Sequence, residues 1–208
     1  NHLMGSGAGG TLTTGSNNIM IGTNSGQNDV NTTTGANNIC IGSYANTAAT
    51  DSTYCISIGY DVGCAGDSNF TFGNNASDTT CVHGATTWTA PSDVRLKENI
   101  KDEEIGLEFV NELRPVTYQW KKAKDVPSEM KAHNPDSEER VMNGKYNHGF
   151  IAQEVKEVID RYDFKEGFDM WTKDGEDGRQ RIGESALIPI LVKAIQELSA
   201  DVEKLKGA

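Results

Sequence analysis

A serine and a lysine five residues apart are the side chains of this sequence best placed to perform chemistry together. Ser92 and Lys97 are the first and last residues of the segment SDVRLK. A serine hydroxyl becomes a nucleophile when a base removes its proton, and a lysine can be that base only when burial lowers its pKa towards neutrality. We therefore predict a nucleophile at Ser92 and a general base at Lys97. The plainer alternative is that Ser92 caps a turn and Lys97 is a surface cation.

The bond that such a serine could attack lies directly before it. Attack of Ser92 on the carbonyl of Pro91 would give an ester that water then hydrolyses. The composition changes at the same point, because no Lys, Arg or Glu and 14 of the 22 glycines precede Ser92, whereas all 19 basic residues follow it. We predict three segments: a cloning remnant or linker at 1–10, a β-repeat segment at 11–91, and a separate domain at 92–208.

Charge and hydropathy argue against several classes of protein. The net charge of −11 is negative in both parts, so neither part offers the basic surface that nucleic acid requires. No apolar run approaches the roughly 20 residues that span a bilayer, so membrane insertion is not expected. The spacing of Cys40, Cys55, Cys64 and Cys81 fits neither a zinc site nor a dense disulfide framework. We expect them to pack as small apolar residues, without a metal or cofactor.

The first part contains a repeat that ends in glycine. Its units are TGSNNIMIG (14–22), TGANNICIG (34–42), STYCISIG (52–59) and SNFTFG (68–73), with Gly84 as a candidate for a fifth. The apolar residues alternate, as in Ile19 and Ile21, so they share one strand face, and the glycine allows a corner with positive φ. One unit cannot bury an apolar face alone, so the repeats must stack. Their scarcity of apolar residues predicts a core shared among identical chains, in a β-prism.

This repeat resembles the β-rich shafts of phage tail fibres and the heads of trimeric bacterial adhesins, which use Asn-x-Ile-x-Ile-Gly units. The resemblance covers about residues 14–84. It implies a structural fibre segment whose tip loops could contact a receptor.

From Asp102 onward the pattern changes to helices and short strands. Ile105, Phe109, Val110 and Leu113 have helical spacing before Pro115, which predicts a helix that ends there. Further along the chain we expect a strand at 116–120, a surface loop at about 121–145, a strand at 150–152, a helix at 153–162 and a hairpin at 169–182.

A heptad seam lies near the end of the sequence. It consists of Ile188, Leu191, Ile195, Leu198, Val202 and Leu205. It predicts a trimerising helix at about 186–206, which needs partner helices. β-branched residues at the a positions with Leu at d favour a parallel dimer in isolated coiled coils. A seam of about three heptads is too short to determine the number of chains against the attached domain. The repeat segment favours three chains, so we predict a homotrimer.

Four motifs in order resemble the endosialidase-type intramolecular chaperone found at the C-terminus of phage tail fibres and tailspikes. They are SDVRLKENI (92–100), LRPVTYQW (113–120), HGFIAQEV (148–155) and ALIPILVKAIQEL (186–198). The resemblance implies that 92–208 trimerises, helps the upstream fibre to fold, and then cuts the chain before Ser92 with Lys97 as base. His148, Gln153 and Glu154 lie in the third motif and are candidates to orient the pair or donate to the oxyanion. Each of the three has a structural role as its alternative.

The fold class expected is therefore an α+β chaperone domain with a C-terminal coiled-coil helix, preceded by an all-β trimeric fibre or β-prism segment. The implied partners are two further copies of the chain, the upstream fibre of the same chain and a host cell-surface receptor. The implied locations are the virion tail fibre and, for the chaperone, the host cytoplasm during assembly. Two rival hypotheses are a non-cleaving trimeric adhesin with a structural cap and an autoprocessed regulatory protein that carries the same module.

Overall fold

The structure is a computed structural model, and it describes residues 1–75, 77–162, 164 and 167–207. The chain forms two compact units, Asn1–Ile100 and Lys101–Ala208. The boundary expected before Ser92 lies within the first unit, in a stretch of exposed residues. The division at Ser92 stays a prediction.

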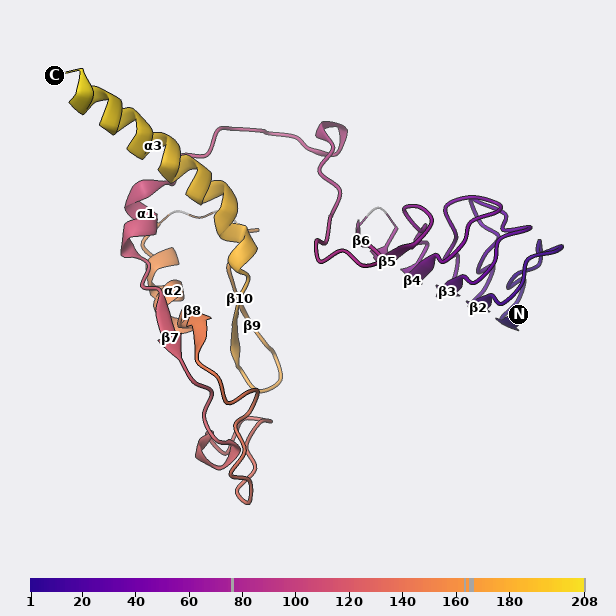
Figure 1. Cartoon of the computed structure of the whole chain (residues 1–208), viewed down its shortest axis with the longest axis horizontal. Coiled ribbons are helices and arrows are strands. Elements are labelled where there is room, and N and C mark those ends of the chain that lie inside the picture. The colour runs from indigo at the N-terminus through magenta and orange to yellow at the C-terminus, as the bar shows by residue number, and fades with distance from the viewer. Residues whose placement is uncertain (76, 163, 165–166, 208) are drawn as a thin grey trace. The chain divides into compact units, whose positions relative to one another are not determined.

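The first unit is built on one six-stranded sheet. Its strands are β1 (His2–Met4), β2 (Ile19–Ile21), β3 (Ile39–Ile41), β4 (Ile56–Tyr60), β5 (Asn69–Asn74) and β6 (Ser77–Val82). They are hydrogen-bonded in chain order, with β1 to β5 parallel and β6 antiparallel to β5. The repeats therefore stack as predicted, in a β-solenoid-like sheet within one chain (Figure 1). The β-prism shared among three chains stays a prediction.

Residues His2–Met4 form part of this sheet, whereas we expected a cloning remnant or linker at 1–10; that assignment stays a prediction. Strand β1 pairs in parallel with β2, beginning with His2 opposite Ile19. Gly5 has a φ of +130°, the same value as Gly22 after β2, and Ala8 is buried in the interior of the stack. The segment is therefore the first coil of the solenoid. Its sequence, HLMG, keeps the final glycine but lacks the Ile-x-Ile pattern by which the other coils are identified.

Glycine is required where the parallel strands end. Gly22, Gly42, Gly59 and Gly73 have φ values between +127° and +148°, a region that favours glycine. They also stack on one another, so a Cβ atom at Gly42 would collide with the carbonyl oxygen of Gly59. Gly84 follows β6, which is antiparallel, so the proposed fifth repeat does not form another parallel coil.

Small and polar residues fill the interior of the stack. Met20, Cys40, Ser57 and Thr71 are the inward residues of β2 to β5, they are fully buried, and they lie opposite one another in register. Burial of Cys40 was expected from its place in an apolar strand, and the structure confirms it. The stack therefore has a narrow core that large apolar side chains do not dominate.

Buried asparagines join successive coils. The Asn18 amide nitrogen donates to the carbonyl oxygen of Gly35 at 2.8 Å, and that of Asn38 donates to Ser52 at 2.7 Å. The Asn38 side-chain oxygen accepts from the backbone N–H of Cys55 at 2.9 Å. Because buried polar groups need partners, this ladder satisfies backbone groups that the short strands leave unpaired.

The paired apolar residues of each strand face away from this core. Their prediction to share one strand face is confirmed, but Ile41, Ile58 and Phe72 are exposed in the single chain. We call the outward residues of β2 to β5 the apolar ladder: Ile19, Ile21, Ile39, Ile41, Ile56, Ile58, Phe70 and Phe72. The ring of Trp88 packs against Phe70 and Phe72, with centroid distances of 5.6 and 5.5 Å.

The second unit combines helices with two small sheets. Its elements are α1 (Leu107–Glu112), β7 (Val116–Tyr118), the 3-10 turn η2 (Ala123–Asp125), β8 (Asn147–Gly149), α2 (Ala152–Ile159), β9 (Trp171–Lys173), β10 (Gln180–Ile182), the 3-10 turn η3 (Glu184–Leu187) and α3 (Ile188–Lys206). Strand β7 pairs with β8, and β9 pairs with β10, both antiparallel (Figure 1). The hairpin expected at 169–182 and the terminal helix are confirmed.

One strand was predicted three residues too late. We expected it at 150–152, but β8 ends at Gly149 and Ala152 already begins α2. The sequence Asn147-His148-Gly149 has little intrinsic preference for a strand, and it is extended because it pairs with β7. Cross-strand pairing therefore outweighed the apolar pattern on which the prediction depended.

Helix α3 packs one of its sides against the core of the second unit. The buried residues of this core are Phe109, Leu113, Val155, Val158, Met170, Leu187 and Ile190. A Glu197 carboxylate oxygen on α3 accepts from the backbone N–H of Leu107 at 2.8 Å, at the start of α1. No helix among the described residues is both long and apolar enough to cross a membrane.

Candidate active site

A short turn brings Lys97 back towards Ser92. Residues Val94–Leu96 form a 3-10 turn, capped by Asp93, whose carboxylate accepts from the backbone N–H of Arg95 at 2.9 Å. The Arg95 guanidinium also binds that carboxylate, at 3.0 and 2.6 Å, and these bonds lower the pKa of Asp93. The turn closes with the Lys97 N–H donating to the carbonyl of Val94 at 3.1 Å.

The turn places the two predicted catalytic side chains in direct contact. The Lys97 ammonium donates to the Ser92 hydroxyl oxygen at 2.7 Å, which is within the distance for proton transfer between a nucleophile and its base. Both residues are exposed. A lysine can accept the hydroxyl proton only in its neutral form. The arrangement can therefore act as a dyad only after Lys97 loses its proton, which burial would favour.

Exposed apolar side chains lie close to this pair in the sequence. Val94, Leu96 and Ile100 retain 67%, 64% and 66% of their accessible surface. Three large aliphatic residues within a nine-residue exposed segment are a typical sign of a surface that is covered in an assembly. Covering them would also remove water from Ser92 and Lys97.

The three predicted supporting residues lie in the second unit. His148 is exposed on β8, opposite Thr117 on β7. It lines an open cavity of about 470 Å³ together with Phe150 and Glu184. Gln153 and Glu154 are in the first turn of α2. Ser92 and Lys97 belong to the first unit, so a shared site with these three residues stays a prediction.

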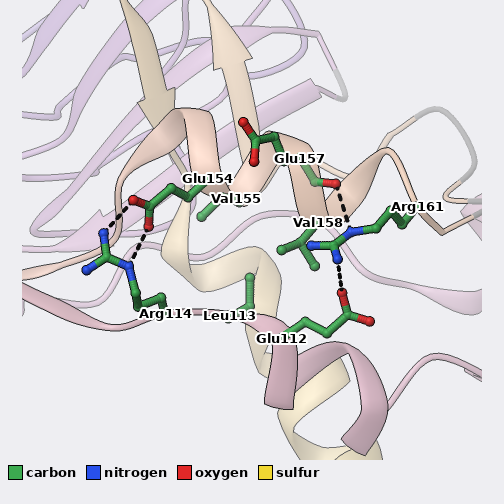
Figure 2. Close-up of a pocket in the computed structure, with 8 residues that line it drawn as sticks. All are labelled: Glu112, Leu113, Arg114, Glu154, Val155, Glu157, Val158 and Arg161. Atoms are coloured by element: carbon green, nitrogen blue, oxygen red, sulfur yellow. Dashed lines mark hydrogen bonds and ion pairs between the residues drawn. The ribbon is translucent and has the colours of Figure 1, made fainter.

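Glu154 is held by an arginine of another motif. Its carboxylate accepts from both Arg114 Nε, at 2.9 Å, and the Arg114 terminal nitrogen, as Figure 2 shows. This two-point bond lowers the pKa of Glu154. It joins the LRPVTYQW motif to the HGFIAQEV motif, so Glu154 has a structural contact whether or not it also takes part in chemistry.

Arg114 and Glu154 line a small cavity with a volume of about 120 Å³. A second ion pair lies on the opposite side of this cavity. Arg161 binds the Glu112 carboxylate at 2.9 Å and the backbone carbonyl of Glu157 at 3.2 Å (Figure 2). The Tyr162 hydroxyl donates to the same Glu112 carboxylate at 2.7 Å, which raises the pKa of Tyr162 to about 12. Both arginines of the cavity are therefore already neutralised by carboxylates.

The heptad seam of α3 is exposed along its length in the single chain. All six predicted residues, Ile188, Leu191, Ile195, Leu198, Val202 and Leu205, are exposed large hydrophobic residues. The buried positions of the same helix, Ile190 and Ala194, face the core of the unit. The helix thus has two apolar sides, and one of them lacks a partner within the described part of the chain.

Sequence reasoning missed two residues that lie beside the predicted supporting residues of the second unit. Arg114 pairs with Glu154, and its place in a recognised motif was a signal that could have identified it. Glu184 lines the cavity beside His148, but the two residues are far apart in the sequence, and only the fold shows their proximity.

Comparison with known proteins gives a family match for a segment that begins at Ser92. Residues 92–164 match the family described as chaperone of endosialidase, and the family model is named as a peptidase. This segment is a chaperone domain of the endosialidase type. The match begins at Ser92 and contains three of the four motifs, whereas α3 lies beyond it. Comparison with curated proteins gave no match, and neither did comparison with solved structures.

Proposed function

We propose that residues 92–208 are an intramolecular chaperone that assembles the upstream β-sheet as a trimer and then cuts the chain between Pro91 and Ser92. The observation that carries the proposal is the 2.7 Å contact between Lys97 Nζ and Ser92 Oγ. It lies at the residue where the chaperone family match begins. A dyad at the first residue of a domain is suited to release whatever precedes that domain.

The reaction requires a change in the protonation of Lys97. When Lys97 is neutral, it takes the hydroxyl proton of Ser92, and Ser92 Oγ attacks the carbonyl carbon of Pro91. The C–N bond to Ser92 breaks, its nitrogen receives the proton, and an ester links Pro91 to the serine oxygen. Water then hydrolyses the ester, leaving a carboxylate at Pro91 and a free α-amine at Ser92.

Two exposed apolar surfaces support assembly from identical chains. The α3 seam is a coiled-coil surface without a partner helix among the described residues. The apolar ladder runs along the sheet of the first unit, and its residues Ile41, Ile58 and Phe72 are exposed in one chain, although Trp88 packs against Phe70 and Phe72. A homotrimer would bury both surfaces, and burial around Val94 and Leu96 would lower the pKa of Lys97 at the same time.

The endosialidase-type domain supports a phage origin, with the β-sheet segment as the end of a tail fibre in the virion and the chaperone active in the host cytoplasm. In this proposal the loops of the β-sheet segment would contact a host cell-surface receptor. His148, Gln153 and Glu154 would support the dyad in the assembled trimer. Substitution of His148 by Ala should then leave the trimer intact and slow the cleavage.

Intact mass and N-terminal sequencing test the cleavage directly. A folded sample should contain a fragment that begins Ser-Asp-Val-Arg-Leu-Lys, and any other new N-terminus would contradict the assignment. Ser92→Ala should give a full-length trimer, because the hydroxyl makes no contact that the fold needs. Lys97→Arg should also stay uncut, since a guanidinium keeps its charge and cannot act as a base. A wild-type chain that stays uncut as a stable trimer would favour the non-cleaving adhesin.

The chaperone role has a separate test. Residues 1–91 produced alone should fail to reach the detergent-resistant trimer that the cleaved product forms, because non-local strand pairing is slow and prone to misassociation without a template. After cleavage the product should persist behind a high unfolding barrier. If the segment alone forms the same resistant trimer, the chaperone role is wrong even if cleavage occurs.

A further inference from the structure

Two cysteines meet at the β4 coil of the first unit. Cys55 directly precedes β4, and Cys64 lies in the loop that follows it. Both are free thiols, Cys55 is fully buried, and Cys64 retains only 6% of its accessible surface. Their thiols donate to the same backbone oxygen, that of Gly66, at 3.2 and 3.1 Å. Two sulfurs that share one acceptor atom are close neighbours.

The environment of the pair makes one sulfur the better nucleophile. The two thiols also interact with each other, and this interaction lowers the pKa of Cys64 and raises that of Cys55. The attacking species in thiol–disulfide exchange is the thiolate, so Cys64 is the sulfur that reacts first. The other two cysteines are not part of this pair. Burial raises the pKa of the Cys40 thiol to about 11, and Cys81 lies on a different strand, β6.

We propose that Cys55 and Cys64 are a redox-responsive pair that closes to a disulfide across β4 when a small-molecule disulfide reaches it. The Cys64 thiolate attacks one sulfur of the reagent and releases one thiolate. Cys55 then loses its proton and attacks the Cys64 sulfur of the mixed disulfide, which releases the second thiolate. Two protein thiols are oxidised, one reagent disulfide is reduced to two thiols, and the protons pass to these leaving groups.

The closed form would tie together the two ends of one coil. Strand β4 pairs with β3 on one side and with β5 on the other, so this coil holds the preceding and following coils in the stack. A covalent link between its ends restricts the unfolded chain and should raise the resistance of the sheet to denaturation. This role concerns the stability of the first unit and does not depend on cleavage before Ser92.

Peptide mapping can detect the link, because aspartates flank both cysteines. The full chain is incubated, folded, with hydroxyethyl disulfide, alkylated in denaturant, and digested with a protease that cuts before Asp. Cleavage before Asp51, Asp61 and Asp67 separates residues 51–60 from 61–66. We expect these two peptides as one disulfide-linked species, lighter by two hydrogens than the sum of the reduced peptides. Recovery of both as alkylated thiols, or links that involve Cys40 or Cys81, would overturn the proposal.

Two variants separate the proposed link from incidental oxidation. Cys81→Ser should leave the linked species unchanged, and Cys64→Ser should abolish it while the other cysteines are still alkylated. The thermal midpoint of the first unit should rise on oxidation in the wild type and in Cys81→Ser, but not in Cys64→Ser. A linked species without any rise in the midpoint in the wild type would show that the bond forms but does not stabilise the coil, which would contradict the role proposed here.

Discussion

The two units of this chain are stabilised by different physical means. The sheet of the first unit is held by backbone pairing between coils and by buried polar side chains such as Asn18 and Asn38. The second unit has an apolar core centred on Phe109, whose ring meets those of Tyr162 and Phe164 edge-on at 5.2 and 5.0 Å. One unit therefore depends on hydrogen bonds in register, and the other on apolar burial.

This difference indicates which unit folds first. Parallel coils pair residues that are 14 to 20 positions apart at each step, and such pairing pays loop-closure entropy before any contact forms. The second unit contains helices that form locally. Helix α3 already presents its exposed apolar seam in a single chain. A helical unit that assembles first and a β-sheet that forms later is the order expected of a chaperone and its client.

The largest effect should come from charge in the α3 seam. Ile195→Asp with Leu198→Asp places carboxylates where the partner helices meet, so we expect loss of the trimer, of sheet formation and of cleavage together. Sedimentation and a denaturing gel measure these outcomes. Gln196→Asp with Ala200→Asp adds the same charge to the side of the helix away from the seam and should preserve all three. Efficient cleavage by a monomeric seam variant would show that assembly does not activate the dyad.

A smaller but still large effect is expected from the core of the second unit. Phe109→Ala removes a fully buried ring, which should lower the free energy of unfolding of that unit by about 3–5 kcal/mol. Urea denaturation in the Ser92→Ala background measures it without interference from cleavage. The exposed Glu108→Ala on the same helix is the control and should change stability little. Equal effects of the two substitutions would contradict the importance assigned to the apolar core.

The sequence was sufficient to predict elements that repeat or that have strong periodicity. The three Ile-x-Ile-Gly units, the Phe-Thr-Phe-Gly unit, the hairpin and α3 lie where the patterns placed them, because each pattern follows directly from strand or helix geometry. The first coil was missed since His2 lies opposite Ile19 and breaks the apolar alternation of the repeat. Strand β8 was misplaced since its pairing with β7, and not its composition, makes it extended.

The candidate site was predictable to a similar extent. Ser92 and Lys97 were identified from their types and spacing, and the 3-10 turn between them explains how they meet. The inward direction of Met20 and Cys40 could not be derived from alternation alone. Alternation shows which residues share a face, and it does not show which face is the core.

Within the first unit, loss of a buried amide should have a moderate effect. Asn38→Ala removes one of the two donors to the Ser52 carbonyl, which keeps the Ala36 N–H, and leaves the N–H of Cys55 without its acceptor. An orphaned buried group costs about 1–3 kcal/mol. Water that enters the vacated space should replace part of the lost hydrogen bonds. The total loss of free energy of unfolding should therefore stay below that expected for Phe109→Ala. Denaturation of the cleaved product measures it, with the exposed Thr34→Ala as control. No loss of stability would show that the buried asparagine side chains do not hold the coils together.

The smallest effect is expected from the ion pair that joins two motifs of the second unit. The Arg114 guanidinium lowers the pKa of Glu154 in the folded chain. The ion pair therefore contributes fully to stability above the pKa that Glu154 has in the unfolded chain, about 4.3. It is lost as the pH falls through the lower, folded value. Glu154→Gln should therefore be slightly less stable than the parent chain at neutral pH, and the difference should vanish in acid. Glu157→Gln on the same helix is the control, since the contact of Glu157 with Arg161 uses its backbone carbonyl. If Glu154→Gln instead stops cleavage in a trimer of unchanged stability, Glu154 supports the dyad, and its bond to Arg114 is secondary to that role.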